Sequence, residues 1–500
     1  MPQDQAGCRT QRAGALLSGA SFMCRSAVIS IDDVGRWVAR DSLTDANLRI
    51  HGAACVVIQP SHTGMSMSPS RSSRLYQKIA LRILPFLFLC YVLNFIDRVN
   101  ISFAKLQFLT DLGLSESVFG VATGVFYVSY AAFELPSNLL LARIGAKRTL
   151  LRIMVLWGLC TVAQMFVSGA ASLYFVRFLL GAAEAGFFPG LMLYLSYWFP
   201  DAVRARINSI LLLAVPIAGI TGGPLSGWIM SQMQGSWGLH GWQWLFLLEG
   251  LPAIGLGILA PFLLSDRPEG VTWLSNAERE MLARDLQATQ EKIEVAGRGT
   301  LLSILFDRRV IGLTVVYFSV HLGLSTVTFW TPSILRAAGV SSIATIGLLS
   351  GLISVFTMVG NVLIAYSSDR YLERRWHLAG CFLATALCLV LLRVAVGDVR
   401  ATVVLISIAQ LAMFSVPILF WTIPTAQLDR RSAPAGIAMI SALGSLGGAF
   451  GSALMGALTS RYGTPYVALT VVAGLLLLGM LLLIRLVPAR TAAVSASHAT

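Results

Sequence analysis

The stretch "YVLNFIDRVNISFA", residues 91–104, is apolar except for an acid and a base at its centre, Asp97 and Arg98. It lies in a longer apolar segment, and the whole chain of 500 residues is 56% hydrophobic and only 12% charged. Soluble domains carry about 25% charged residues, so this chain cannot hide its apolar surface in a water-soluble core. The composition predicts an all-α integral membrane protein that crosses the lipid bilayer several times.

Apolar segments long enough to cross a bilayer recur along the chain. A span needs about 20 residues, because the hydrocarbon core is about 30 Å thick. We expect twelve transmembrane helices, at 80–103, 118–140, 149–168, 172–196, 206–230, 242–264, 309–332, 343–366, 377–396, 401–421, 433–458 and 465–487.

Loop charges predict the orientation of these spans. The formal net charge is +13, and most Lys and Arg residues fall on one set of loops, which we assign to the cytoplasm. Both termini then lie inside, as expected for a multi-pass protein of a bacterial-type inner membrane. No soluble domain carries a basic stripe, so we expect no nucleic-acid partner.

The chain also repeats itself. The loop stretch "PSNLLLARIGAKR" (136–148) has a counterpart in "GNVLIAYSSDRYLERR" (360–375), and "GITGGPLSG" (219–227) has one in "GSLGGAFGSALMG" (444–456). Gly-rich helix centres let backbones approach closely. This echo predicts two six-helix pseudo-symmetric bundles, the architecture in which a central site alternates between the two sides of a membrane.

A charged linker separates the two predicted bundles. It contains "LSNAEREMLARDL", which predicts a helix capped by Ser275. The residues before the first span contain no span-length apolar run, and we interpret them as a disordered tail or a mis-assigned gene start. The predicted organisation is an N-terminal extension (1–70), a first bundle (75–265), a cytoplasmic linker (266–308), a second bundle (309–487) and a cytoplasmic tail (488–500).

Four stretches carry a family resemblance: "LNFIDRVNISFA" (93–104), "FELPSNLLLARIGAKR" (133–148), "RFLLGAAEAGFFPGLMLYLSYWFP" (177–200) and "GWQWLFLLEGLPA" (241–253). Together with twelve spans they resemble the anion:cation symporter family of the major facilitator superfamily. The resemblance implies the major facilitator fold and proton-coupled uptake of an organic anion. Permeases for tartrate, phthalate, hydroxyphenylacetate, hexuronates and sugar acids belong to that family.

One loop departs from the superfamily pattern. The loop after the second span keeps the basic residues, including Arg143, but lacks the Gly and the acid that usually precede them. The equivalent loop after the eighth span keeps its acid, in Asp369 and Arg370. We expect Arg143, Asp369 and Arg370, together with Glu134, to be gating or structural charges.

Ionisable residues inside spans are rare and usually functional. Arg177 and Glu184 are seven residues apart, almost two helical turns, so they share one helix face. We expect Asp97 to pair with Arg177 in one state and release it in another. Arg98 then remains free to bind a substrate carboxylate, which matches the guanidinium fork.

The two acids, Asp97 and Glu184, are the candidate proton carriers. Burial raises the pKa of a carboxyl group and a nearby Arg lowers it, so moving the Arg changes proton affinity. The resemblance implies the same division of roles at Asp97, Arg98, Arg177 and Glu184. A static salt-bridge network that only fixes helix packing is the alternative.

Other residues are candidates for contacts to the substrate. The predicted substrate-binding residues are Arg98, Tyr130, Arg177, Tyr194, His321 and Trp421. Core packing is an equally open interpretation for the aromatic residues and His321, and we interpret Glu249 as structural.

The combined prediction is a secondary transporter that imports a small organic carboxylate by proton symport. An antiporter or efflux carrier, and a receptor that binds a carboxylate without moving it, stay open. We expect no enzyme, because the sequence has no catalytic triad and no metal-ligand spacing. The expected partners are the organic anion, the proton and the lipid bilayer, with no cofactor, no metal and a monomeric state.

Overall fold

The computed structural model describes residues 69–294, 307–371, 373–428 and 433–487. These residues form α-helices and short 3-10 turns, and none of them lies in a β-strand. Residues 78–500 form one compact unit, and the contacts reported below lie within it. The tail predicted at 488–500, and the predicted extension as far as residue 68, fall outside the described ranges.

The first half of the chain contains eight helices among its described residues, and the second half contains seven, with α10 between them. They are α2 (Pro69–Asp111), α3 (Glu116–Ile144), α4 (Ala146–Ala163), α5 (Ala170–Glu184), α6 (Phe187–Ser196), α7 (Asp201–Leu212), α8 (Ala214–Gln232), α9 (Gly241–Leu263), α10 (Asn276–Glu294), α12 (Arg308–Ala337), α13 (Ile343–Tyr371), α14 (Arg375–Leu391), α15 (Val399–Phe420), α16 (Thr422–Gln427), α17 (Ala433–Tyr462) and α18 (Pro465–Leu486).

All twelve predicted spans coincide with helices. Within the described ranges, eleven helical segments are long and apolar enough to cross a membrane, and the remaining predicted span is the shorter apolar helix α14. The span predicted at 172–196 is broken between α5 and α6, where Gly186 has φ +84°. Any side chain there would meet Ser137, whose Oγ lies 2.5 Å from a Cβ built on Gly186. Glu184 is therefore the last residue of α5.

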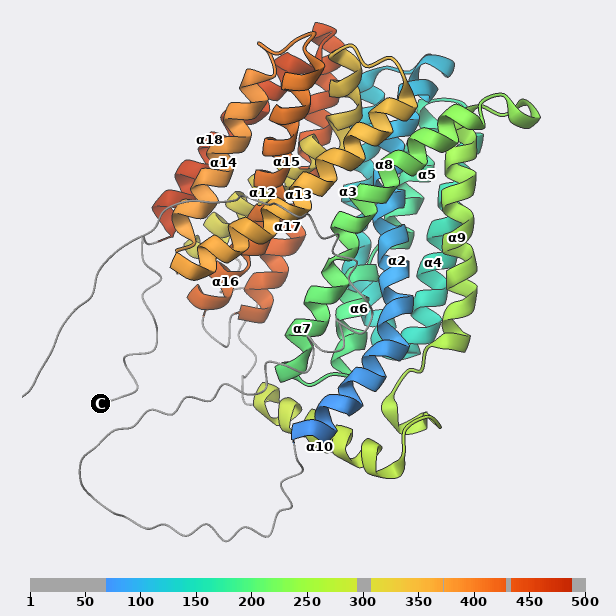
Figure 1. Cartoon of the computed structure of the whole chain (residues 1–500), viewed down its shortest axis with the longest axis vertical. Coiled ribbons are helices and arrows are strands. Elements are labelled where there is room, and N and C mark those ends of the chain that lie inside the picture. Colours follow the sequence, from blue (N-terminus) through green and yellow to red (C-terminus); the bar gives the residue numbers. More distant parts are fainter. Residues whose placement is uncertain (1–68, 295–306, 372, 429–432, 488–500) are drawn as a thin grey trace, which may run out of the picture. The chain divides into compact units, whose positions relative to one another are not determined.

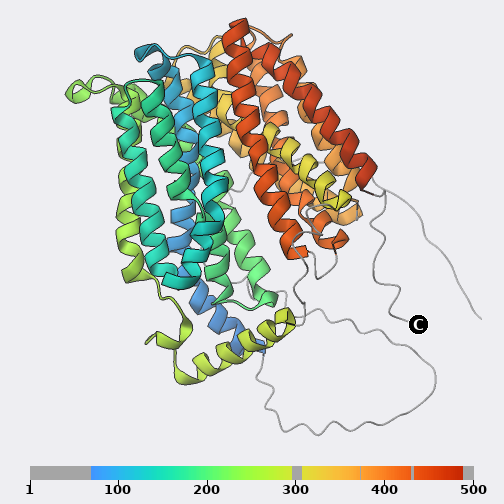
Figure 2. The same cartoon turned by 180° about the vertical axis from the view of Figure 1, so that it is seen from behind.

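The helices of the two halves segregate as predicted. Figures 1 and 2 show α2–α9, in blue to green, on one side of the compact unit and α12–α18, in yellow to red, on the other. The halves meet where α3 packs along α17 and α8 packs along α13. A Cβ built on Gly120 would lie 2.4 Å from the carbonyl oxygen of Ser452, and one built on Gly223 would lie 2.8 Å from that of Gly347. The Gly-rich stretches thus permit close contact between the halves.

The linker contains the predicted helix, α10. The backbone N–H of Glu278 donates to Ser275 Oγ at 3.2 Å, and the backbone N–H of Ser275 donates to Glu278 Oε2 at 2.8 Å. Lys78 on α2 forms an ion pair with the same carboxylate at 2.9 Å. The Ser275 N–H and the Lys78 ammonium together hold the pKa of Glu278 below its usual value. The domain boundaries on either side of this linker stay a prediction.

Candidate functional site

Asp97 and Arg98 point to different helices, as their positions on α2 require. Successive residues of an α-helix are about 100° apart around its axis. Asp97 faces Trp157 on α4, whose indole Nε1 donates to Asp97 Oδ2 at 2.7 Å. Arg98 faces Glu184 on α5 and forms an ion pair with it. The two charges therefore have separate partners.

The ion pair between Arg98 and Glu184 joins a partly exposed base to a fully buried acid. Arg98 Nε donates to Glu184 Oε1 at 3.1 Å, and Asn94 Nδ2 donates to the same oxygen at 2.8 Å. The side chain of Glu184 is 0% exposed, whereas that of Arg98 is 22% exposed. The Arg98 side chain thus keeps some exposure beside an acid that has none.

Asp97 and Arg177 form no ion pair in the described part of the chain in this conformation, so the pair expected in one state of the cycle stays a prediction. Asp97 instead accepts hydrogen bonds from Trp157 and, at 3.1 Å, from Asn100 Nδ2. Arg177 is fully buried, and none of its three guanidinium nitrogens has a hydrogen-bond partner among the described residues. Its guanidinium carbon lies 4.8 Å from the ring centroid of Phe126. The seven-residue spacing correctly placed Arg177 and Glu184 on the buried face of α5, but it did not predict which groups they contact.

Aromatic rings surround Arg98. Its guanidinium carbon lies 5.3 Å from the ring centroid of Tyr130 and 5.6 Å from that of Phe126, both on α3. Tyr130 is thus placed beside the predicted anion-binding base. Rings at these distances attract a guanidinium electrostatically and hold it in position.

The second half contributes a cluster around Tyr317 on α12. The ring of His321 lies edge-on to Tyr317, with centroids 4.6 Å apart. Trp421 Nε1 donates to the Tyr317 hydroxyl at 3.2 Å. His321 is close enough to Arg98 for an electrostatic interaction between the two halves. Of the predicted substrate-binding residues, Tyr130 therefore lies beside Arg98 in the central region, and His321 and Trp421 contact Tyr317 in the second half.

Tyr194 and Glu134 are placed differently. The Tyr194 hydroxyl donates to the backbone oxygen of Ser265 at 2.9 Å, and its ring is fully buried. This ties α6 to the segment after α9 and does not bring Tyr194 to the central region. Glu134 is half-buried on α3 and interacts electrostatically with Arg98.

The loop between α3 and α4 lacks an acid in its own sequence, and the carboxylate of Asp266 binds there instead. Arg143 is exposed near the end of α3, and Gly145 starts α4 with φ +83°. Asp266, just after α9, accepts a hydrogen bond from the backbone N–H of Lys147 at 2.9 Å. A carboxylate is favourable at the positive end of the α4 dipole. The acid missing from the loop sequence is thus supplied by a segment more than 100 residues away.

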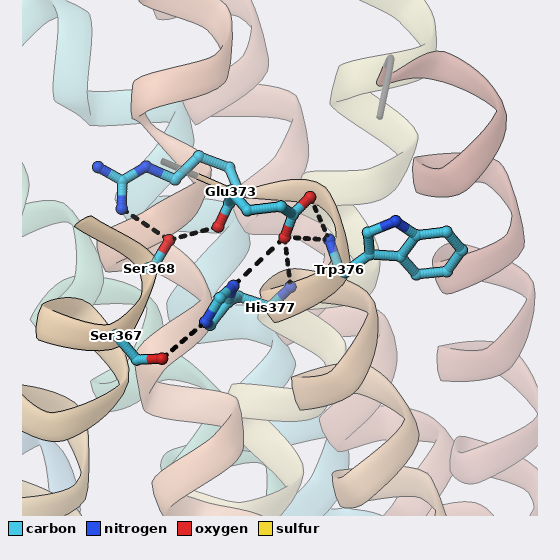
Figure 3. A network of polar contacts seen from close by, with 6 residues as sticks. Ser367, Ser368, Glu373, Trp376 and His377 are labelled. Atoms are coloured by element: carbon cyan, nitrogen blue, oxygen red, sulfur yellow. Dashed lines mark hydrogen bonds and ion pairs between the residues drawn. The ribbon is translucent and has the colours of Figure 1, made fainter. Parts of the chain in front are cut away.

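A polar network joins the ends of α13 and α14, and Ser368 and Glu373 lie at its centre (Figure 3). Arg374 forms an ion pair with Asp369 and also donates to Ser368 Oγ at 2.7 Å. Glu373 accepts from the first backbone N–H groups of α14, including that of Trp376 at 2.9 Å. Arg370 is exposed. The gating or structural role expected for Asp369 and Arg370 stays a prediction.

The same end of the second half carries a groove of about 590 Å³. Its lining comes from α13, α14 and α15 and includes Trp376 and His377. None of the predicted substrate-binding residues lines it. The groove is therefore separate from the central region around Arg98.

Sequence reasoning missed several residues of the central network. Asn94 and Asn100 flank the Asp-Arg pair at intervals of three residues, and both are buried. Amides within an apolar span were a visible indication of hydrogen bonding. Trp157 and Tyr317 gave no such indication, because aromatic residues in spans usually pack in the core.

Comparisons with known proteins agree with this architecture. Residues 87–439 match the family model described as Major Facilitator Superfamily. A protein of Agrobacterium vitis named "Putative tartrate transporter" is 43% identical over 82% of this chain and 90% of its own length. A "Quinolone resistance transporter" of Acinetobacter baumannii is 34% identical over 81% of this chain and 93% of its own length. The inward-open structure of the xylose transporter XylE from E. coli has a TM-score of 0.66 at 18% identity, over 83% of this chain and 97% of that one.

Proposed function

We propose that this chain, which belongs to the Major Facilitator Superfamily, imports a small organic carboxylate together with protons. The protein is a multi-pass membrane transporter and not an enzyme. One observation carries the finer proposal: the partly exposed Arg98 is held by the fully buried acid Glu184. A base in that position can exchange one carboxylate partner for another.

The substrate competes with Glu184 for Arg98. When Glu184 is ionised, it holds the Arg98 guanidinium, and the carboxylate of an entering anion must displace it. A proton on Glu184 weakens the ion pair, so Arg98 can donate its fork of hydrogen bonds to the substrate carboxylate. Release of the substrate returns Arg98 to Glu184, and the restored ion pair takes the place of the proton.

Coupling to protons has an energetic reason. A membrane potential of about 100 mV, inside negative, opposes each entering negative charge by about 2.3 kcal/mol. Co-transport of one proton per negative charge cancels this electrical work. One further proton makes the potential favour import. A dicarboxylate therefore needs more than one proton-carrying group for accumulation.

Contacts between the halves support alternating access. The backbone N–H of Ser117, at the start of α3, donates to Ser460 Oγ, near the end of α17, at 2.7 Å. At the same end, Lys105 Nζ lies 3.6 Å from the ring centroid of Trp330 on α12. This end has few basic loop residues, so we assign it to the outside. The proposed conformation is then closed towards the outside.

The substrate class is a small hydroxy acid or aromatic acid. The name of the Agrobacterium vitis relative favours a tartrate-like dicarboxylate. Efflux is the second candidate, favoured by the name of the Acinetobacter baumannii relative. The partly exposed Arg98, beside the rings of Tyr130 and Phe126, supports an anionic substrate over a cationic drug.

Uptake of radiolabelled tartrate into proteoliposomes, with an imposed pH gradient, tests this proposal. We expect accumulation only when the outside is acidic. Glu184→Gln should abolish accumulation but keep exchange of internal for external tartrate, because it mimics a permanently protonated acid. Arg98→Ala should lose both activities, and Glu269→Gln, an exposed acid outside the spans, should behave as wild type. Accumulation that ignores the pH gradient, or that survives in Glu184→Gln, contradicts proton symport through this pair.

A further inference from the structure

Glu249 is a buried acid that the mechanism above does not use. It lies in the middle of α9 and is 5% exposed. Its Oε1 atom accepts a hydrogen bond from Ser226 Oγ on α8 at 3.0 Å. Its Oε2 atom is buried and has no hydrogen-bond partner among the described residues. The carboxyl group is thus only half satisfied.

Asn100 connects this acid to the central network. Its Nδ2 atom donates to Asp97 Oδ1 at 3.1 Å. The same amide group is near enough to the carboxyl group of Glu249 for its N–H to act on it. Its Oδ1 atom is buried and lacks a donor within the described part of the chain. A single amide therefore lies between two buried carboxyl groups on α2 and α9.

The two unpaired atoms, Glu249 Oε2 and Asn100 Oδ1, are both hydrogen-bond acceptors, so each of them lacks a donor. Burying an acceptor without a donor is unfavourable, and burying an uncompensated carboxylate is more so. A proton on Glu249 Oε2 supplies a donor for Asn100 Oδ1 and removes the buried negative charge. One proton held between Glu249 Oε2 and Asn100 Oδ1 thus satisfies both acceptors.

The charged neighbours of Glu249 do not offer an alternative. Asp97 is the acid that faces it from α2, and α8 presents the neutral Ser226. From α4, Trp157 donates to Asp97, and the thiol of Cys160 interacts with the same acid. None of the ion pairs between described residues includes Glu249, and Arg98 is held by Glu184. No cation therefore compensates an ionised Glu249 here.

The amide also provides a route between the two acids. In the orientation seen here, Asn100 donates to Asp97 and can accept from a protonated Glu249. With the amide turned over, it donates to Glu249 and can accept from a protonated Asp97. The two orientations hold the same proton on opposite acids, and turning the amide requires no movement of the helices.

We propose that Glu249 is a second proton-binding residue of the transport cycle and shares its proton with Asp97 through Asn100. This inference rests on the proposed proton symport. It supplies the additional proton-carrying group that accumulation of a dianion requires. It also explains why α9 carries an acid where packing alone would favour an apolar residue.

The test measures how strongly tartrate accumulation depends on the pH gradient in proteoliposomes. Losing one coupled proton lowers the accumulation ratio about tenfold for each pH unit of gradient. We expect that loss for Glu249→Gln, with tartrate exchange and affinity kept, because Gln preserves the hydrogen bond from Ser226 but cannot release a proton. Glu249→Asp, which keeps an acid, should restore the dependence. Asn100→Leu, which removes the bridge, should lose the same proton.

The controls separate this inference from the proposed function. Ser226→Ala removes only the donor to Oε1 and should keep the wild-type dependence, whereas a purely structural role predicts that Ser226→Ala is impaired and that Glu249→Gln, which keeps this hydrogen bond, is not. A wild-type protein that ignores the pH gradient overturns the proposed function. A wild-type protein that responds to it, together with an unchanged Glu249→Gln variant, overturns this inference alone.

Discussion

The close contact between α3 and α17 gives a prediction whose size follows from the structure. A Cβ built on Gly120 would lie 2.4 Å from the carbonyl oxygen of Ser452 and 2.9 Å from the Cα atom of Gly456. Both are backbone atoms, which cannot turn aside as a side chain can. Gly120→Ala therefore forces the two helices apart by about 1 Å, given ordinary van der Waals separations between carbon atoms of about 3.5 Å or more.

The clash caused by Gly120→Ala destabilises the conformation in which α3 and α17 are in contact at this position. Overpacking costs about 1–3 kcal/mol, which corresponds to a shift of about 5- to 150-fold in the equilibrium between two states. Because the clash disappears when the helix ends separate, Gly120→Ala should favour the conformation that is open at this end. Uptake should slow, since each cycle must pass through the disfavoured state.

Labelling of a cysteine at position 452 measures this shift. Ser452 is fully buried and its hydroxyl has no hydrogen-bond partner among the described residues, so Ser452→Cys is a mild reporter. We expect a membrane-impermeant maleimide to label it at least several-fold faster when Gly120→Ala is present. Gly474→Ala is the matched control, because a Cβ built there meets nothing within 4 Å. Equal labelling rates in the two variants would refute the steric reasoning.

Three further outcomes follow from single contacts. Trp330→Leu removes the ring beneath the buried ammonium of Lys105; a desolvated cation–π contact contributes about 2 kcal/mol, so the same labelling assay should again show faster reaction. Arg177→Met removes a buried charge without hydrogen-bond partners and should raise the thermal unfolding temperature of the substrate-free protein while impairing tartrate binding. The pKa of Glu278 is lowered, so its cap and its pair with Lys78 stabilise α10 above the unfolded pKa of about 4.3 and lose that effect as pH falls through the lower folded pKa. Hydrogen exchange in α10 should therefore increase at acidic pH, whereas Glu278→Gln should show no such pH dependence.

The fold was largely predictable because hydrophobic length is a strong constraint in membranes. All twelve predicted spans coincide with helices, and the capped linker helix begins next to Ser275 as expected. The break after Glu184 was not predicted. It depends on Gly186 adopting a positive φ beside Ser137, and a glycine in an apolar segment does not by itself reveal its backbone conformation. The sequence also did not predict that an acid binds at the start of α4, since Asp266 is far from that helix along the chain.

The central site shows where helix geometry stops being sufficient. Adjacent positions on one helix predicted that Asp97 and Arg98 would serve different partners, and they do. Helix geometry could not say which partners, because that depends on how α4 and α5 are rotated against α2. The rotation leaves Arg177 without a carboxylate and gives Glu184 to Arg98. A transporter needs such an arrangement: a network in which every charge is already paired has no reason to rearrange, whereas an unpaired buried base favours any movement that brings an acid to it.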